Sequence, residues 1–410
     1  MTWSRRRFLT TSALAGVGLA AGWPRPARAQ TKPITVAHSV STFVYGQHLV
    51  AREKKFFEED GVSVANFIVP GAGARVVNAV TAGQAMFGLG DSNHPLKATE
   101  KGKETTMLFA TDTRCSYANI VVRKELYEKG VKTVDALADR KLVGRKAVIA
   151  ATAIGSGTYV YGVYVLKNTK AADGKPVNDH VEWVGGGAST TMLGGLKAGK
   201  FDAIMAVPEW QWAAEDEGFG KAVYDVLDER AWDRVFGGPI AVTVGFALKE
   251  TLEKSPDLVQ GYVNACYRAQ QWIRKAKDDE IVDLVYKPYM DTFKREIVLR
   301  SVKYYKTIFD WDFVIDPKDY DNSMKVFVPE VIDKPIPYAR AIDMAFVGKA
   351  HQKIKSCALR RASSSATWPR RFARRRARCP PSTTSRSRSV TRSSSPSSGR
   401  RAAANRPSST

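Results

Sequence analysis

The chain has 410 residues, of which 44% are hydrophobic, and a formal net charge of +22. The basic excess lies at the two ends: residues 1–29 hold five arginines and no acid, residues 357–410 hold fourteen arginines and no acid, and only +3 remains for residues 30–356. A nucleic-acid-binding function needs a basic patch on the folded part, so the charge distribution argues against nucleic acid as a partner. The middle segment is long enough for two lobes with separate hydrophobic cores.

Residues 1–29 have the features of an export signal. A twin-arginine pattern, SRRRFL, occupies residues 4–9, and the apolar stretch at residues 9–23 is shorter than the roughly 20 residues of a membrane anchor. Ala27-Arg28-Ala29 offers a small-x-small cleavage site, and no cysteine follows it to accept lipid. We expect export by the twin-arginine route, cleavage after Ala29 and a periplasmic mature protein.

Residues 30–119 are predicted to form the first part of lobe 1. We expect a strand at residues 34–37, a helix at 44–59, a strand at 64–69, a helix at 76–81 and a strand at 85–88. Polar and glycine-rich turns follow the first two strands, where parallel sheets bind ligands. The candidate ligand contacts there are Ser41, Thr42, Phe43, Gly71 and Ala72.

The strand at 85–88 leads directly to four polar residues, Asp91-Ser92-Asn93-His94. Asp91, Ser92 and Asn93 are candidate ligand contacts because they follow a buried strand at the edge of the cleft. The alternative is that Asp91 or Ser92 only caps a helix that begins near Pro95.

Residues 120–240 are predicted to form lobe 2, around the stretch at residues 146–166. Its β-branched run stops at Gly155-Ser156-Gly157-Thr158 and an apolar helical pattern follows at once, which predicts strand, tight turn and helix N-terminus. Free N–H groups and the helix dipole at such a turn favour an anion, so Ser156, Gly157 and Thr158 are candidate contacts. The turn fits neither a dinucleotide fingerprint nor a P-loop, although it could also serve packing alone.

The chain contains this unit twice. Thr42-Phe43-Val44-Tyr45-Gly46 and Thr158-Tyr159-Val160-Tyr161-Gly162 match at four of five positions, 116 residues apart, and Ala82-Gly83 falls on Ala198-Gly199 at the same offset. A repeat of this length indicates two similar α/β lobes rather than a solenoid. Both glycine turns should then face one cleft.

Lobe 2 continues with a second glycine turn, which contains the candidate contact Gly187, and a helix at 188–197. A strand at 201–206 ends at Pro208-Glu209-Trp210. Glu209 and Trp210 would offer a carboxylate and an aromatic wall to a ligand, although most tryptophans only pack.

Residues 241–356 are predicted to return to lobe 1. The first strand to cross between the lobes is predicted at residues 119–122. A second crossing strand at 239–248 precedes helices at 258–274, 278–285, 294–308 and 318–331. Cys115 and Cys266 follow no disulfide framework, which favours two buried free thiols.

The segment 357–410 is rich in arginine and serine and has no hydrophobic period, so it is expected to be disordered. The abrupt break after Ser356 favours an out-of-frame reading of a GC-rich gene, and a functional basic tail is the alternative.

The core resembles the periplasmic solute-binding proteins of the nitrate, sulfonate and taurine type, a group that includes thiamine-precursor binders. The resemblance rests on Phe56-Phe57 with Asp60-Gly61-Val62, the stretch from Gly83 to Asp91, the Gly155–Thr158 turn and the run Ala198–Ala203 that leads to Pro208-Glu209. It implies a type II periplasmic-binding-protein fold, hinge closure over a small-molecule ligand and delivery to a membrane ABC permease. The chain departs from a common tryptophan-glutamate-proline order, since it has Pro208-Glu209-Trp210.

Three classes of function follow. The first is a monomeric binding protein without a cofactor for a small anion such as a sulfonate, taurine, nitrate or an aromatic acid. The resemblance also implies the alternative, a pyrimidine-precursor binder or synthase-like enzyme of thiamine metabolism. Against an enzyme, the five histidines are scattered, none has a metal-ligand spacing, and no Gly-x-Ser-x-Gly elbow occurs, so we expect no catalytic residue and no metal. Nucleic-acid or surface binding would depend on the basic tail alone.

Overall fold

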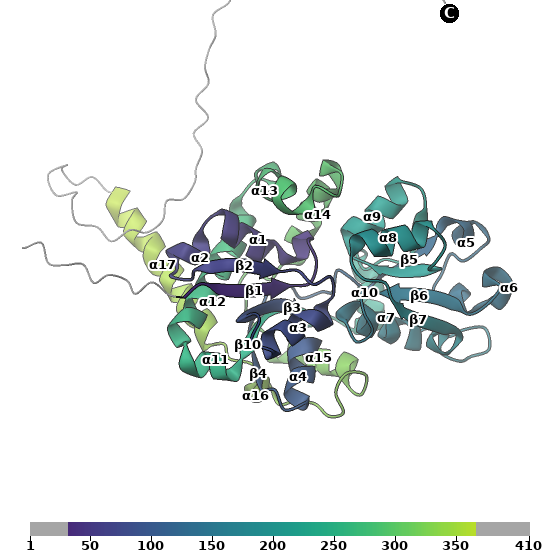
Figure 1. The fold of residues 1–410 in the computed structure, drawn as a ribbon, viewed down its shortest axis with the longest axis horizontal. Helices are drawn as coiled ribbons and strands as arrows, with labels where there is room; N and C mark the ends of the chain where they lie inside the picture. Colours follow the sequence, from purple (N-terminus) through teal and green to yellow (C-terminus); the bar gives the residue numbers. More distant parts are fainter. Residues whose placement is uncertain (1–31, 366–410) are drawn as a thin grey trace, which may run out of the picture. The chain divides into compact units, whose positions relative to one another are not determined.

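The computed structural model describes residues 32–365. The predicted export signal and residues 366–410 of the predicted tail lie outside the described residues. Two five-stranded sheets flanked by helices form two lobes (Figure 1). This confirms the predicted α/β, two-lobe architecture.

The sheet of lobe 1 is mixed. β1 is parallel to β2 and β3, whereas β10 is antiparallel to both β3 and β4. The spatial order of the strands is β2 (Val64–Ile68), β1 (Ile34–His38), β3 (Phe87–Asp91), β10 (Thr243–Leu248) and β4 (Thr105–Ala110).

The sheet of lobe 2 has the same topology, which is the structural counterpart of the repeat at an offset of 116. Its antiparallel member, β5, follows the first crossing between the lobes, just as β10 follows the second. The spatial order is β7 (Val181–Gly185), β6 (Ala147–Ala151), β8 (Ala203–Ala206), β5 (Asn119–Arg123) and β9 (Gly220–Tyr224). The sequence pattern predicted β5 and β10 as crossing strands but missed β4 and β9.

Helices cover both sheets. Those of lobe 1 are η1 (Phe43–Tyr45), α1 (Gly46–Glu53), α2 (Phe56–Glu59), α3 (Gly73–Thr81), α4 (Asn93–Glu100), α11 (Lys249–Lys254), α12 (Pro256–Lys275), α13 (Asp278–Val285), the π-helical η4 (Tyr286–Met290), α14 (Arg295–Ile308), α15 (Pro317–Phe327), α16 (Tyr338–Ala341) and α17 (Ala345–Ser365). Those of lobe 2 are α5 (Lys124–Glu128), η2 (Asp135–Ala138), α6 (Arg140–Val143), α7 (Gly157–Lys167), η3 (Val177–His180), α8 (Ser189–Lys197), α9 (Pro208–Asp216) and α10 (Glu229–Phe236).

The prediction of a single helix at residues 44–59 is wrong in one respect. The structure divides this stretch into η1, α1 and α2. Lys55 has a φ of 57°, a left-handed conformation that interrupts the helix between α1 and α2. The apolar residues keep a helical spacing in the sequence across the break, and Phe57 of α2 packs into the core.

Two C-terminal helices of lobe 1 reach lobe 2. On α14, Arg300 donates to Asp216 of α9, with an Nη1–Oδ2 distance of 3.2 Å, and its guanidinium lies 4.5 Å from the centre of the Trp212 ring. On α15, the Phe327 ring lies 6.1 Å from the ring of Tyr161 on α7. Both contacts join lobe 1 to lobe 2.

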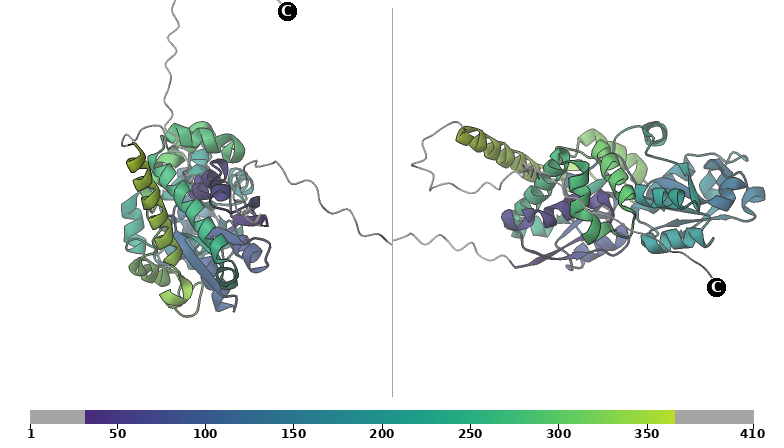
Figure 2. Two further views of the ribbon diagram at one scale, coloured as in Figure 1. Left: turned by 90° about the vertical axis from the view of Figure 1, so that its left-hand side faces the viewer. Right: turned by 90° about the horizontal axis from the view of Figure 1, so that it is seen from above.

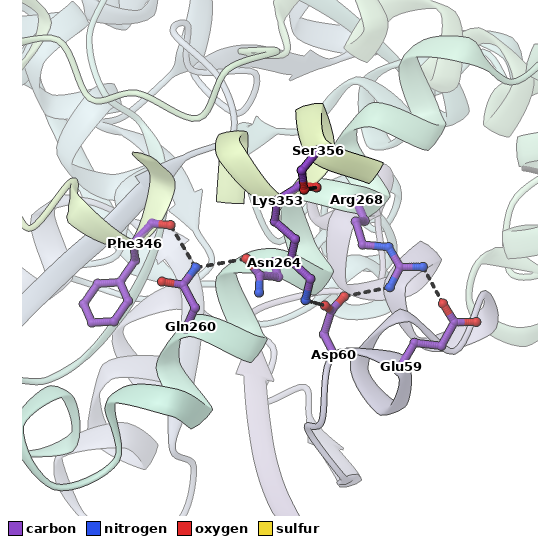
Figure 3. A network of polar contacts seen from close by, with 8 residues as sticks. All are labelled: Glu59, Asp60, Gln260, Asn264, Arg268, Phe346, Lys353 and Ser356. Carbon is purple, nitrogen blue, oxygen red and sulfur yellow. Dashed lines mark hydrogen bonds and ion pairs between the residues drawn. The ribbon is translucent and has the colours of Figure 1, made fainter. Parts of the chain in front are cut away.

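A buried carboxylate fastens α17 to lobe 1 (Figure 3). Asp60, whose side chain is 1% exposed, accepts from Arg268 of α12 at 2.7 Å and also pairs with Lys353 of α17. Figure 2 shows α17 on the side of lobe 1 that faces away from lobe 2. The helix extends to Ser365, beyond the boundary predicted at Ser356, since alanine, leucine and arginine after that point favour a helix.

Cys115 and Cys266 are both buried and free, as the sequence predicted. Within residues 32–365, no helix has the length and apolar composition needed to cross a membrane.

Candidate ligand site

A cavity of about 30 Å³ lies between the lobes and is lined from both sides. This volume holds roughly two water molecules, so the lobes meet around a small space. Four predicted contacts, Asp91, Gly157, Thr158 and Trp210, line it. The other lining residues are Ser39, Val40, Val44, Tyr45, Gly73, His94, Tyr117, Thr152 and Val207.

Asp91, at the end of β3, is a buried carboxylate with several donors. Its Oδ1 accepts from both nitrogens of Asn93, with a distance of 2.9 Å to the backbone nitrogen, and its Oδ2 accepts from the Tyr117 hydroxyl. Burial raises the pKa of Asp91 to about 6, although these hydrogen bonds act in the opposite direction. Asp91 therefore accepts from the first backbone N–H of α4 and also lines the cavity.

The N-terminus of α7 faces this carboxylate across the cleft. A Cβ built on Gly157 would lie 2.7 Å from Asp91 Oδ2 and 2.9 Å from Tyr117 Cε2, so only glycine allows this close approach. The N-cap residue, Ser156, makes no side-chain bond to the helix N–H groups, and first-turn N–H groups have no acceptor within their own helix. These donors and the helix dipole favour the negative charge of Asp91.

Ser156 itself points away from the cavity. Its hydroxyl donates to the Ala153 carbonyl at 2.7 Å and lies 2.9 Å from the hydroxyls of Thr152 and Thr158. The side chain is buried, and it is not part of the cavity wall. This hydroxyl cluster holds the turn between β6 and α7 in place and presents Thr152 and Thr158 to the cavity.

Two fully buried side chains of the cavity wall carry a polar atom without a hydrogen-bond partner. They are Trp210 of lobe 2, through Nε1, and His94 of lobe 1, through Nε2. Burial lowers the pKa of His94 to about 3, so the imidazole is neutral. An unpaired buried polar group costs about 1–3 kcal/mol, which a ligand with matching polar groups would relieve.

Glu209 lies outside the cavity wall although it precedes Trp210. Its Oε1 accepts from the backbone nitrogen of Phe43 in lobe 1 at 3.0 Å, and its Oε2 has no partner. Burial raises the pKa of Glu209 to about 7, against the effect of this hydrogen bond. The structure therefore places two predicted contacts, Phe43 and Glu209, in a contact between the lobes.

The remaining predicted contacts lie around the cavity without lining it. Ser92 donates to the Ala241 carbonyl at 2.6 Å, and Asn93 is engaged with Asp91. A Cβ on Gly71 would lie 3.3 Å from Ala188 Cβ of lobe 2, which marks another contact between the lobes. Of the others, Ser41, Thr42 and Ala72 precede or cap helices near the cleft, and Gly187 lies in a turn with a φ of 82°.

The sequence carried a signal for some of the residues that were missed. Tyr45 stands in the repeated five-residue stretch, and His94 stands in the tetrad after β3. In contrast, Tyr117 lies in the segment between the lobes, and no local pattern indicates that its hydroxyl reaches Asp91.

The wall contains one carboxylate and no lysine or arginine. No group of three or more potential metal ligands occurs in residues 32–365. The polar groups available to a ligand are therefore hydroxyls, the indole N–H, a neutral imidazole, the α7 amides and Asp91.

Residues 28–285 match the model of the NMT1-like family. The chain belongs to the NMT1-like family. Among solved structures, a Bordetella bronchiseptica RB50 protein is 22% identical with a TM-score of 0.68, and the match covers 80% of this chain and 99% of that one. The nitrate-binding protein NrtA from Synechocystis PCC 6803 is 12% identical with a TM-score of 0.61, covering 79% and 90%.

The alkanesulfonate-binding protein SsuA from Xanthomonas axonopodis pv. citri is also 12% identical, with a TM-score of 0.60 and coverage of 77% and 100%. The desulfurization enzyme DszB shares the fold too, at 15% identity and a TM-score of 0.53 over 78% and 99% of the chains. The periplasmic-binding-protein fold of this NMT1-like chain is thus established, and its chemistry depends on its own residues.

Proposed function

We propose that this NMT1-like protein is the periplasmic binding component of an ABC importer. It captures a small organic acid between its lobes by hinge closure, as a monomer, and delivers it to a membrane permease. The observation that carries the proposal is that two residues of one cavity wall, Trp210 and His94, belong to opposite lobes and each has a polar atom, Nε1 or Nε2, without a partner.

The charges of the wall narrow the ligand class. An anionic group is supported by the α7 amides and the Trp210 N–H, but no cationic side chain neutralises it and Asp91 lies beside it. A ligand that carries a hydrogen-bond donor as well as an acidic group is more complementary to this wall, because the donor is attracted to Asp91. Among the predicted ligands, an amino-sulfonate such as taurine therefore suits the site better than nitrate.

The residues of the cavity wall are better suited to binding a ligand than to catalysing a reaction. The Tyr117 hydroxyl is the one wall hydroxyl bonded to a carboxylate among the described residues. Burial raises the pKa of Tyr117 well above its usual value, which makes the phenol a poor nucleophile at neutral pH.

A thermal-shift screen tests the proposal. Taurine, methanesulfonate, nitrate and benzoate are compared at equal ionic strength, and a ligand at 100 times its dissociation constant stabilises by about 2.7 kcal/mol. We expect taurine to raise the melting temperature more than methanesulfonate does, and Trp210→Phe to reduce the shift. A shift of the same size in Trp210→Phe would show that the binding site lies elsewhere.

A further inference from the structure

A second, larger cavity lies beside the two segments that connect the lobes. Its volume is about 500 Å³, and its wall comprises Thr113 and Arg114, part of α10 with the residues that follow it, and the C-terminal end of α14. Thr113 and Arg114 belong to the first connection, between β4 and β5, and residues 237–239 belong to the second, between α10 and β10. An occupant would therefore touch both connections at once.

The second connection has the backbone of a hinge. Gly237 and Gly238 have φ values of 73° and 129°, so consecutive residues adopt conformations that other residues rarely reach. The Trp232 Nε1 donates to the Gly238 carbonyl at 2.9 Å, and Ile240 N donates to the Thr113 carbonyl at 2.9 Å. Trp232 thus ties the wall of the cavity to the second connection between the lobes.

Arg114 gives the cavity its chemistry. Its side chain is only 14% exposed, and its buried Nη1 has no hydrogen-bond partner. The paired carboxylate oxygen, Glu229 Oε1, is 3.7 Å away on a side chain that is 78% exposed, so the pair is loose. A guanidinium binds a carboxylate through parallel N–H donors, and this one has an unused donor.

A second unused donor lies nearby on α14. Tyr304 is three and four residues before Thr307 and Ile308 of the wall, about one turn along α14, and does not itself line the cavity. Its buried hydroxyl has no hydrogen-bond partner. Burial raises the pKa of Tyr304, and the positive charge of Arg114 opposes that shift, which places the two groups within electrostatic range. The phenol is protonated and can donate.

The outer part of the wall is acidic. Glu229 and Asp233 stand one helical turn apart on α10, and both are exposed. A dianion would be repelled by these carboxylates, whereas a donor on the occupant would be attracted to them.

We propose that this hinge cavity binds a small carboxylate that also carries an amino or hydroxyl group. The carboxylate meets Arg114, which is within electrostatic range of Tyr304, and the donor faces Glu229 and Asp233. Since the occupant bridges both connections, its binding and the closure of the lobes influence each other, as linkage requires. The inference does not depend on the ligand that binds between the lobes.

The test uses full-length protein labelled with ¹⁵N-tryptophan, in which the indole N–H resonance of Trp232 is assigned with Trp232→Phe. The probes are glycine, acetate and methylammonium, each added as a salt or zwitterion at constant ionic strength. We expect glycine to shift the Trp232 resonance in a saturable way, acetate to do so with lower affinity and methylammonium to leave it unchanged. An equal response to methylammonium would contradict the carboxylate assignment.

Variants separate this site from a general effect. Arg114→Gln should raise the apparent dissociation constant for glycine at least about tenfold, Tyr304→Phe severalfold, and the exposed control Arg230→Gln on α10 not at all. The conservative Tyr304→Phe keeps the test decisive if Arg114→Gln folds poorly. No saturable shift of Trp232, equal affinities of Arg114→Gln and Arg230→Gln, or a shift confined to the Trp210 resonance would overturn the proposal. A failure here leaves the screen for the inter-lobe ligand unaffected.

Discussion

The two lobes treat their matching helix N-termini differently. In lobe 1, the start of η1 presents the Phe43 N–H to Glu209 of lobe 2 at 3.0 Å. In lobe 2, the start of α7 at Gly157 faces Asp91 of lobe 1, close enough that no Cβ fits between them. Each lobe thus directs a carboxylate at a helix start of the other lobe: Asp91 from the end of β3 and Glu209 from the first turn of α9, which follows the equivalent strand β8.

The difference lies in what surrounds each carboxylate. Asp91 accepts hydrogen bonds on both oxygens and lines the cavity, whereas Glu209 leaves Oε2 unpartnered and lies outside the cavity wall. At offset 116 the counterpart of Gly157 is Ser41, so only lobe 2 has the glycine that admits the close approach. The comparison teaches that a helix start which favours anions can serve contact between lobes, and we propose that the ligand uses the helix start of lobe 2.

The largest effect on ligand affinity is expected from a substitution whose side chain would push the lobes apart. Gly157→Val places a Cβ 2.7 Å from Asp91 Oδ2, so the lobes cannot meet as they do here, and ligand affinity should fall at least about 100-fold, or about 2.7 kcal/mol. Calorimetric titration measures this with the ligand that the screen identifies. The control is Gly194→Val on α8, where nothing lies within 4 Å. Equal affinity in both variants, with native circular dichroism, would mean that this approach is irrelevant to binding.

Glu209 should make the stability of the closed protein depend on pH. Its pKa in the folded protein is about 7, above its ordinary value of 4.5, so the folded state holds a proton that the unfolded chain releases. The stability contribution is therefore present at low pH and is lost as pH rises from about 4.5 to about 7, by at most roughly 3 kcal/mol. Asp91 and Asp112, with pKa values raised by burial to about 6 and about 7, also contribute to the decrease in stability as the pH rises.

Glu209→Gln sharpens this expectation. An amide oxygen still accepts from Phe43 N but carries no charge, so the melting temperature of the variant should fall less between pH 5 and pH 8 than that of the wild type. Ligand affinity should be retained at pH 5, because Glu209 lies outside the cavity wall. Parallel pH profiles for the two proteins would rule out a titrating contact at Glu209.

The smallest effect concerns one donor in the cavity. Trp210→Phe keeps the aromatic wall and removes the Nε1–H, which has no partner within the protein. We expect a loss of about 0.5–1.5 kcal/mol in binding, or up to roughly tenfold, with no decrease of the melting temperature in the absence of ligand, because the unpaired N–H does not stabilise the fold. A melting temperature that falls sharply would indicate that the indole N–H supports the fold.

The sequence predicted the two lobes because a repeat in register, from Thr42 to Gly199, survives in both halves. It also predicted Asp91, Gly157, Thr158 and Trp210 at the cavity, since each follows a buried strand or opens a helix. It could not assign Glu209, because local pattern does not tell which way a first-turn side chain of α9 points. Tyr117 was not predicted for a related reason. Its hydrogen bond to Asp91 depends on the course of the first connection between the lobes. Strands β4 and β9 were missed because their segments, residues 105–110 and 220–224, lack clear alternation between apolar and polar residues.

The most direct measurement is the distance between the lobes with and without ligand. Spin labels at Val69→Cys in lobe 1 and Ile154→Cys in lobe 2 would occupy two exposed positions, with Cys357 and Cys379 replaced by serine, while the buried Cys115 and Cys266 stay unlabelled. We predict that the ligand from the screen shortens and narrows the distance distribution, and that Gly157→Val abolishes this change. A ligand that binds by calorimetry but leaves the distribution unchanged would contradict capture by closure of the two lobes.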